Sequence, residues 1–285
     1  MHRTLTAFGF KRALWRYAGL RDLHVAGGYG QIVGSIHDRA ILERYAETGT
    51  WCPIENHMFM DFFVLHGGGT YLDIGANIGL TTIPIARNPR VVCFAFEPEP
   101  VNFAYLQENV RTNCPAGNVL LFKLALLDRA ATLDLRISPT NKGDHRLLPG
   151  ARFSTPSEEG WSVVQVEAKR LDDVAVDHQI VPPVAAKIVA QGSELHIVAG
   201  GGRILSTAEL LMIEFYPYLL SRTEADWDLF YSFLAANFVR AALINGGQQA
   251  EQRWQPVADA IDRLMLLAQT ASQRADLYFH VFFRK

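Results

Sequence analysis

The segment Y-L-D-I-G-A-N-I-G-L at residues 71–80 constrains the fold of this chain more than any other feature. A short apolar run ends in Asp73, a glycine-containing turn follows, and residues 81–86 can open a helix. A strand that turns on glycines into a helix presents free backbone N–H groups and a positive dipole end to a ligand. A second predicted strand, residues 91–96, ends in Glu97, whose carboxylate could accept both hydrogen bonds of a ribose diol.

Two kinds of nucleotide cofactor could use this layout. A dinucleotide site requires the spacing G-x-G-x-x-G, because the pyrophosphate must touch the backbone. Counted from Gly75, the second and third glycine positions hold Asn77 and Leu80, so that pattern fails. The carboxylate two residues before Gly75 disfavours a phosphate and suits a ligand with an amino group and a sulfonium. We therefore predict S-adenosylmethionine, with its ribose on Glu97; the alternative is an ordinary glycine turn in which Asp73 is a local cap.

The composition is that of an ordinary soluble globular protein and disfavours several function classes. The 285 residues carry a net charge of −2, with 49% hydrophobic and 20% charged residues. This balance gives no electrostatic case for nucleic acid, and charges interrupt every apolar run of residues 1–50, so we expect neither a signal peptide nor a membrane span. Cys52, Cys93 and Cys114 have no zinc spacing and no disulfide framework. We expect a cytoplasmic protein without a metal, and the oligomeric state stays open.

Strands and helices alternate along the chain, which predicts a doubly wound α/β domain. Residues 1–55 are expected to form an N-terminal extension, and residues 56–285 the main domain. Within the extension, the basic and apolar stretch 8–21 either packs on the domain or contacts a membrane surface or partner. The apolar segment 55–65 is expected to be a helix that covers one edge of the sheet.

Three further segments carry predictions about the sheet. Residues 119–127 form a continuous apolar run, as in a parallel strand buried on both faces. Residues 131–137 and 162–168 alternate with period two and predict a hairpin-like insert, about 131–168, near the acceptor site. Residues 276–284 are expected to be a final antiparallel strand at or near the edge of the sheet.

Several separated motifs occur in the order seen in one known family. They are DIGANIG at 73–79, FEPEP at 96–100, NKGDHR at 141–146, KIVAQGSEL at 187–195 and IEFYP at 213–217. Together they resemble the FkbM family of S-adenosylmethionine-dependent methyltransferases, over roughly residues 60–220. The resemblance implies the Rossmann-like class I methyltransferase fold, with one antiparallel strand in a mostly parallel sheet. It also implies O-methylation of a hydroxyl on a sugar, polyketide or other small natural product.

The resemblance also assigns residues to the site. The cofactor positions would be Asp73, Gly75, Ala76, Asn77, Gly79, Glu97 and Pro98. Apart from the resemblance, the end of the apolar run 119–127, near Leu124 and Ala125, is expected to lie beside the adenine of such a cofactor. The polar substrate-side positions would be Asp144, His145, Lys187, Glu194 and Glu214. One position departs from the family, which usually has an acidic residue where this chain has Val189. Either a neighbouring group takes over, or the chain is a cofactor-binding protein with weakened catalysis.

A hydroxyl acceptor must also lose its proton, and a nearby base contributes a factor of ~10²–10⁴ to the rate. His145 is the first candidate, because an unperturbed histidine titrates near neutrality, and we expect it on the acceptor side of the pocket. Asp144 could orient His145 or act itself; the alternative is an ordinary turn with a solvated histidine. Lys187 could hold the substrate oxygen or form a structural ion pair with Glu214. A nucleic-acid methyltransferase is a third, disfavoured possibility, because no basic face is evident.

Overall fold

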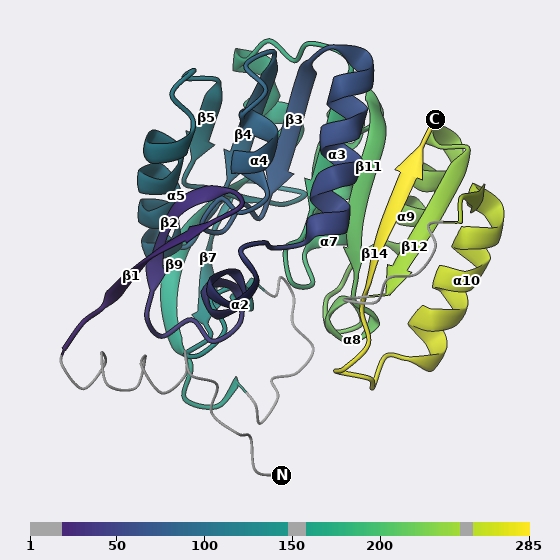
Figure 1. Ribbon diagram of the computed structural model, residues 1–285. Helices are drawn as coiled ribbons and strands as arrows, with labels where there is room; N and C mark the ends of the chain where they lie inside the picture. The colour runs from purple at the N-terminus through teal and green to yellow at the C-terminus, as the bar shows by residue number, and fades with distance from the viewer. Residues whose placement is uncertain (1–18, 148–157, 246–252) are drawn as a thin grey trace.

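One mixed sheet forms the centre of the computed structural model, which describes residues 19–147, 158–245 and 253–285 (Figure 1). Its strand order is β13-β12-β14-β11-β10-β3-β4-β5. The bounds are β3 (Gly69–Ile74), β4 (Val91–Phe96), β5 (Val119–Phe122), β10 (Val184–Ile188), β11 (Ala208–Phe215), β12 (Arg240–Asn245), β13 (Gln255–Pro256) and β14 (Phe279–Arg284). In the part of the sheet with the order β11-β10-β3-β4-β5, each strand is parallel to its neighbours. β14 is antiparallel to both β11 and β12.

The final strand is antiparallel and near one edge of the sheet, as predicted. β14 is third from that edge, between β11 and β12. The residues Phe279 to Phe283 are all buried, because helices cover both faces of the sheet at this point. Since β14 runs against its neighbours, its first residues meet the carboxyl ends of the parallel strands. The last segment of the chain therefore reaches the edge of the sheet where ligands bind in α/β proteins.

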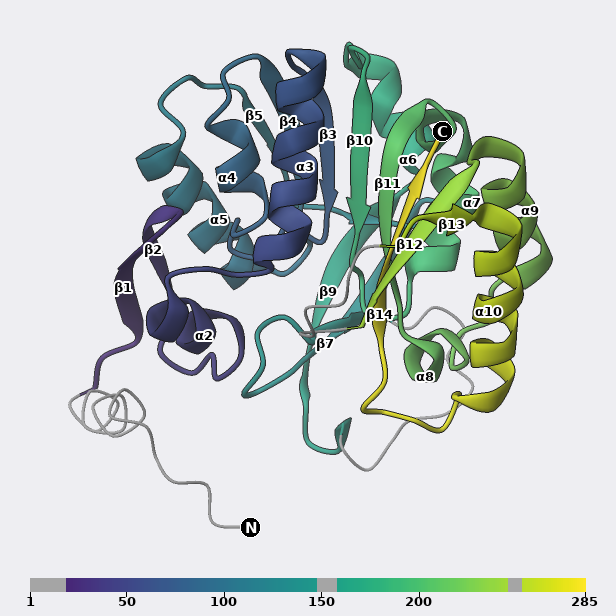
Figure 2. The ribbon, with the colours of Figure 1, turned by 45° about the vertical axis from the view of Figure 1, so that its right-hand side comes forward.

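Helices cover both faces of the sheet, which confirms the doubly wound α/β prediction. α3 (Pro53–His66), α4 (Thr82–Ala86) and α5 (Pro100–Asn113) pack on one face. α7 (Glu194–Leu205), α9 (Trp227–Asn237) and α10 (Val257–Thr270) pack on the other. Figure 1 shows α3 in front of the sheet with α9 behind it, and in the turned view of Figure 2 α3 lies to the left of β10 and β11 and α7 and α9 lie to the right. The short helices α6 (Leu171–Val174), η2 (Ala175–Asp177) and α8 (Pro217–Leu220) lie in connections.

The helix α3 covers the middle of a sheet face and not an edge, which corrects the prediction. The ring of Phe59 lies 5.0 Å from that of Tyr71 on β3 and 5.4 Å from that of Phe282 on β14, measured between centroids. These contacts bridge strands that are far apart in sequence. Side chains alternate between the two faces of a strand, so Tyr71 and Asp73 point to the side of α3. The first turn of α3 is thereby held over the carboxyl ends of the central strands.

The apolar run at 119–127 is not one continuous central strand. β5 ends at Phe122, the exposed Lys123 follows, and Ala125–Leu126 form β6 of a second sheet. β5 is the edge strand of the main sheet, and its residues are only half-buried. The second sheet has the order β6-β9-β7-β8, and it contains β7 (Ala131–Ile137), β8 (Arg146–Leu147) and β9 (Ser162–Lys169). β7 and β9 pair antiparallel, which confirms the predicted hairpin of the insert.

The described part of the N-terminal segment contains a hairpin that the sequence did not predict. β1 (Asp22–Gly27) pairs with β2 (Gly30–Ser35), and α2 (Ile41–Thr48) follows. Asn109 of α5 donates to the Val33 carbonyl at 2.9 Å and accepts the Val33 N–H at 2.7 Å. A helix side chain thus satisfies both backbone hydrogen-bonding groups of this residue in β2. Most of the stretch 8–21 lies outside the described residues. No helix within the described ranges has the length and apolarity to cross a membrane.

Candidate active site

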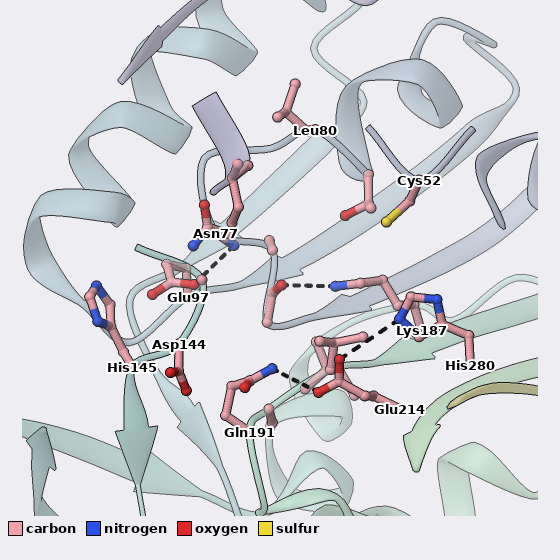
Figure 3. A pocket seen from close by; sticks show the side chains of 18 of the residues that line it. Cys52, Asn77, Leu80, Glu97, Asp144, His145, Lys187, Gln191, Glu214 and His280 are labelled. Carbon is pink, nitrogen blue, oxygen red and sulfur yellow. Dashed lines mark hydrogen bonds and ion pairs between the residues drawn. The ribbon is translucent and has the colours of Figure 1, made fainter. Parts of the chain in front are cut away.

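A cavity of about 840 Å³ opens at the carboxyl ends of the parallel strands, where the loops after β3, β4, β10 and β11 meet the start of β14 (Figure 3). Most of the predicted site residues line it: Gly75, Ala76, Asn77, Glu97, Pro98, Leu124, Ala125, Asp144, His145, Lys187 and Glu214. Asp73, Gly79 and Glu194 are not part of its wall. Figure 3 shows Glu97 and His145 on one side of the cavity, with Lys187, Glu214 and His280 on the other.

The glycine turn after β3 is shaped by close backbone contacts. Gly75 has a φ of +81°, and a Cβ at this position would lie 1.9 Å from the Val189 carbonyl oxygen at the end of β10. The N–H groups of Gly75 and Ala76 both donate to the Phe96 carbonyl, at 3.0 and 2.9 Å. Glycine suits this position because it adopts a positive φ readily and has no Cβ to collide with the carbonyl oxygen. The turn thus draws the ends of β3, β4 and β10 together at one point.

Glu97 is fixed at the end of β4 by the same turn. Its Oε2 accepts the Asn77 N–H and its Oε1 accepts the Glu99 N–H, each at 2.9 Å. Burial raises the pKa of Glu97 to about 7, although the two backbone N–H groups act to lower it. A carboxylate has about four lone-pair sites, so each oxygen can still accept one hydrogen bond from a ligand. The geometry suits a diol that donates to both oxygens.

Asp73 has a different role from the one expected. Its side chain is buried, with Oδ1 at 2.8 Å from the Lys187 Nζ. Its Oδ2 accepts the hydroxyl hydrogens of Thr81 and Thr82, each at 2.7 Å. The charge that was expected to receive the ammonium of a ligand is therefore neutralised within the protein. Asp73 positions the turn, the start of α4 and Lys187, and it does not itself reach the cavity.

Lys187 also corrects an expectation, since its partner is Asp73 and not Glu214. Its Nζ donates to the Gly75 carbonyl at 2.8 Å in addition to the Asp73 carboxylate. These bonds tie β10 to the turn after β3, and they occupy two of the three N–H groups of the ammonium.

Gly79 also lies away from the cavity, in the tight contact between the turn and helix α5, where it has a φ of +95°.

Glu194 is a structural residue in this arrangement and not a wall of the cavity. Its Oε1 accepts the Ala190 N–H at 2.7 Å, and its Oε2 accepts the Gly192 N–H at 2.9 Å. The side chain is fully buried, and burial together with the charge of Glu214 raises its pKa to about 8. The prediction of a substrate contact by Glu194 is wrong for this structure, because both oxygens face the loop after β10.

His145 uses its Nδ1 as a hydrogen-bond acceptor within the protein, which does not favour the role of base that the sequence suggested. Its Nδ1 accepts the Ser138 N–H at 3.1 Å, so the neutral ring carries its proton on Nε2, which is buried without a partner in the described structure. Burial lowers the pKa of His145 to about 4, and the charge of Lys142 acts in the same direction. Asp144 does not orient His145, because its carboxylate binds Arg146 in two bonds of 2.7 and 2.9 Å.

The loop that carries these residues rests on the glycine turn and on the start of α5. The Lys142 carbonyl accepts hydrogen bonds from the Asn77 side chain at 2.7 Å and from the Asn102 side chain at 2.8 Å. Asn77 belongs to the glycine turn, and Asn102 to the first turn of α5. His145 is therefore held on the same side of the cavity as Glu97, and its expected contact with an acceptor stays a prediction (Figure 3).

Sequence reasoning missed a cluster at the opposite end of the cavity. His280 of β14 is the register partner of Glu214 on β11. Its Nδ1 lies 2.6 Å from the Glu55 Oε1, and its Nε2 lies 3.8 Å from the Glu214 Oε1. Gln191 donates to the other Glu214 oxygen at 2.7 Å. Burial alone would lower the pKa of His280, but the two carboxylates raise it to about 9. The available signal was one polar residue within the apolar run F-H-V-F-F.

The family comparison and the strand order together define the class of this protein. The chain belongs to the FkbM methyltransferase family, because the model of the methyltransferase FkbM domain matches residues 73–239. The mostly parallel sheet with the antiparallel strand β14 beside β11, the glycine turn after β3 and the acid after β4 agree with the Rossmann-like class I methyltransferase fold that the motifs predicted.

Two curated relatives and a solved structure are similar to this chain. The methyltransferase sdnD of Sordaria araneosa is 29% identical over 152 residues, which are 45% of this chain and 59% of the relative. The 2-O-methyltransferase NoeI of Sinorhizobium fredii is 30% identical over 185 residues, 59% of this chain and 74% of the relative. The methyltransferase FkbM structure from Methylobacillus flagellatus KT is 15% identical with a TM-score of 0.43, covering 76% of this chain and 43% of that chain. The matched part of the chain thus spans less than two thirds of the length of sdnD and of the Methylobacillus structure.

Proposed function

We propose that this protein is an S-adenosylmethionine-dependent O-methyltransferase that acts on a hydroxyl of a sugar, polyketide or other small natural product. The observation that carries the proposal is the Glu97 carboxylate, held by two backbone N–H groups at the wall of the cavity with a lone pair left on each oxygen. A ribose diol satisfies that arrangement. Family membership and the name of the relative NoeI, a 2-O-methyltransferase, support a methyl donor and an oxygen acceptor.

The residues present fit the cofactor. Glu97 would hold the ribose, the glycine turn at Gly75 and Ala76 would lie against the methionine part, and Leu124 and Ala125 would line the adenine side. When bound, the cofactor supplies a methyl group on a sulfonium, which is transferred by in-line displacement. The protein has to place the acceptor oxygen about 3 Å from that carbon and to exclude water.

The free cysteines Cys52, Cys93 and Cys114 are consistent with the reducing compartment that we propose for it.

A second candidate is a cofactor-binding protein of the same fold with weakened catalysis. Val189 favours it, because this residue lines the cavity where the family usually has an acid. Valine cannot accept a hydrogen bond or a proton. The carboxylate of Glu214 lies on the neighbouring strand and also lines the cavity, so the acceptor side still has an acidic group. We therefore favour the active enzyme.

The test separates cofactor binding from transfer. We expect S-adenosylhomocysteine to bind in the micromolar range, about −8 kcal/mol, in calorimetry. Glu97→Ala should weaken binding by ~1.5–3 kcal/mol per charged hydrogen bond lost, whereas Glu167→Ala, an exposed change on β9, should not. Equal affinity in both variants would remove Glu97 from the site. Transfer of labelled methyl to a pool of methyl glycosides and macrolactones then distinguishes an enzyme from a binding protein.

A further inference from the structure

We propose that Glu214 takes the proton from the acceptor hydroxyl, and that His280 and Glu55 are positioning residues that hold Glu214 for this task. This inference rests on the proposed function and deepens it by assigning the acceptor side of the site. None of the three residues was expected to be the base, and both His280 and Glu55 lie outside the segment that matches the family model.

The sheet itself brings these groups together. Glu214 and His280 are register partners on β11 and β14, so their side chains project to the same face of the sheet. That face is covered by α3, whose first turn carries Glu55. The imidazole of His280 lies between the two carboxylates, 2.6 Å from one and 3.8 Å from the other. All three side chains are at most 9% exposed, and all three line the cavity.

Glu214 keeps one oxygen without a hydrogen-bond partner among the described residues, whereas both oxygens of Glu97, Asp144 and Glu194 accept hydrogen bonds within the protein. One oxygen accepts from Gln191, and the second lies beyond hydrogen-bond distance of His280 but close enough for an ion pair. By contrast, Asp144 is bound twice by Arg146, and Glu194 is bound twice by backbone N–H groups. An acceptor hydroxyl can therefore donate to Glu214 without displacing a protein partner from the second oxygen.

The charge of His280 supports this arrangement. The two carboxylates raise the pKa of His280 to about 9 against the effect of burial, so it is a cation at neutral pH. Burial would raise the pKa of Glu55, but the bond and the charge of His280 hold it below its ordinary value. The other titratable groups around this cluster are Cys52, Asp144, Lys187, Glu194, Tyr216 and Tyr278.

Glu214 also lies next to the position of the absent family acid, which is Val189 in this chain. Ile188, the residue before Val189, pairs in register with Ile213, the residue before Glu214. The two positions are thus neighbours on adjacent parallel strands, and both line the cavity. A carboxylate at Glu214 can reach the space that an acid at position 189 would serve. Glu214 is itself a position that the resemblance assigns to the substrate side, and it is the carboxylate that remains next to Val189, with His280 and Glu55 around it.

The reaction step balances with these groups. A bond forms between the acceptor oxygen and the methyl carbon, and the carbon–sulfur bond of the sulfonium donor breaks, leaving a neutral thioether. The hydroxyl proton moves to a carboxylate oxygen of Glu214, which becomes a neutral acid. The imidazolium of His280 stays protonated between this acid and the Glu55 carboxylate. Solvent removes the proton after the methylated product leaves.

The first experiment needs no acceptor. The full chain, saturated with S-adenosylhomocysteine and labelled on histidine, is titrated by NMR, with His280→Gln to assign the signal. We expect an inflection near pH 9 for His280, which falls in Glu214→Gln and in Glu55→Gln because each variant removes one carboxylate. An inflection at or below the ordinary histidine value, or one that Glu214→Gln leaves unchanged, would overturn the proposal.

The second experiment uses transfer of labelled methyl to methyl glycosides. We expect Glu214→Gln to lower kcat by ~10²–10⁴ with unchanged affinity for S-adenosylhomocysteine. Glu214→Asp should restore part of the activity. In the wild type, kcat should fall above about pH 9 as His280 loses its charge, and His280→Gln should lack that inflection. Full kcat in Glu214→Gln refutes the base. A wild type that binds the cofactor product but methylates no glycoside counts against the proposed acceptor class, while the NMR titration still decides the cluster.

Discussion

Asp73 and Lys187 are register partners on β3 and β10, and their charged groups meet at 2.8 Å beneath the glycine turn. The Lys187 side chain is 6% exposed and that of Asp73 is fully buried, so water screens the pair very little. The same ammonium holds the Gly75 carbonyl. The pair therefore connects the stability of the sheet to the shape of the turn that is proposed to receive the cofactor.

Lys187→Met should destabilise the protein by about 3–5 kcal/mol, because it leaves the Asp73 carboxylate buried with two hydroxyl partners and no cation. Lys123→Met, which changes an exposed lysine between β5 and β6, is the matched control. Urea denaturation of both variants without ligand measures the difference. A loss no greater than that of the control would show that the pair contributes little.

Glu97 should make cofactor binding depend on pH. Its pKa is raised to about 7 by burial, whereas ribose hydroxyls donate to the ionised form. Affinity for S-adenosylhomocysteine should therefore rise with pH up to about 7 and then level off, with a slope of up to 1.36 kcal/mol per pH unit below it. For folding, a raised carboxyl pKa contributes stability below the ordinary value, and this is lost as pH rises through 7.

Calorimetry in buffers of different ionisation enthalpy should detect a proton released on binding below about pH 7. Glu97→Gln should bind more weakly and with no such pH dependence, because the amide does not titrate. A wild-type affinity that is constant between pH 5 and 8 would contradict the assignment of Glu97 to the ribose.

Gly75→Ala should abolish cofactor binding and destabilise the fold, because the added Cβ would lie 1.9 Å from the Val189 carbonyl oxygen. Gly117→Ala is a matched control, since Gly117 also has a positive φ, +69°, but has no atom within 4 Å of the added Cβ. The control should lose only the ~1–2 kcal/mol of left-handed backbone strain. Similar losses in thermal unfolding for the two variants would show that the close approach is relieved by a small shift.

His145→Ala should leave the pH dependence of kcat unchanged across neutral pH. The pKa of His145 is about 4, so its ring is already neutral there, and its Nδ1 is occupied by Ser138. What the variant removes is the Nε2–H donor near Glu97. Steady-state rates from pH 6 to 8 in wild type and variant check this. Loss of a wild-type inflection near neutrality would restore His145 as the base.

Val189→Asp should not raise turnover. The new carboxylate would lie beside Glu214, and the nearby cations already have partners: Lys187 binds Asp73 and Gly75, and His280 lies between Glu55 and Glu214. Burying it should destabilise the protein by ~1–3 kcal/mol. The side chain in Val189→Asn has about the same size as in Val189→Asp but no charge. The difference in stability between the two variants therefore measures the electrostatic part of the destabilisation. A clear gain in kcat for Val189→Asp alone would show that the absent acid limits catalysis and that Glu214 does not replace it.

The features that the sequence determined alone are local ones. Alternating apolar runs and helical spacing predict the doubly wound sheet, because each element buries one face or both wherever its neighbours lie. The turn at Gly75 and the acid at Glu97 could be located because a few consecutive residues determine a glycine turn and the end of a strand. The prediction of one continuous buried strand over 119–127 was wrong, because the length and hydrophobicity of the run do not reveal that the chain leaves the sheet after Phe122.

The tertiary structure alone decided which charges meet. Whether Lys187 pairs with Asp73 or Glu214 depends on strand order and on the direction in which each side chain points, and both follow from the assembled sheet. His280 joined the site because β14 inserts antiparallel beside β11, which places a residue near the end of the chain next to Glu214. Since a charged pair acts over a few ångströms, residues far apart in sequence acquire their chemistry only when the fold brings them into contact.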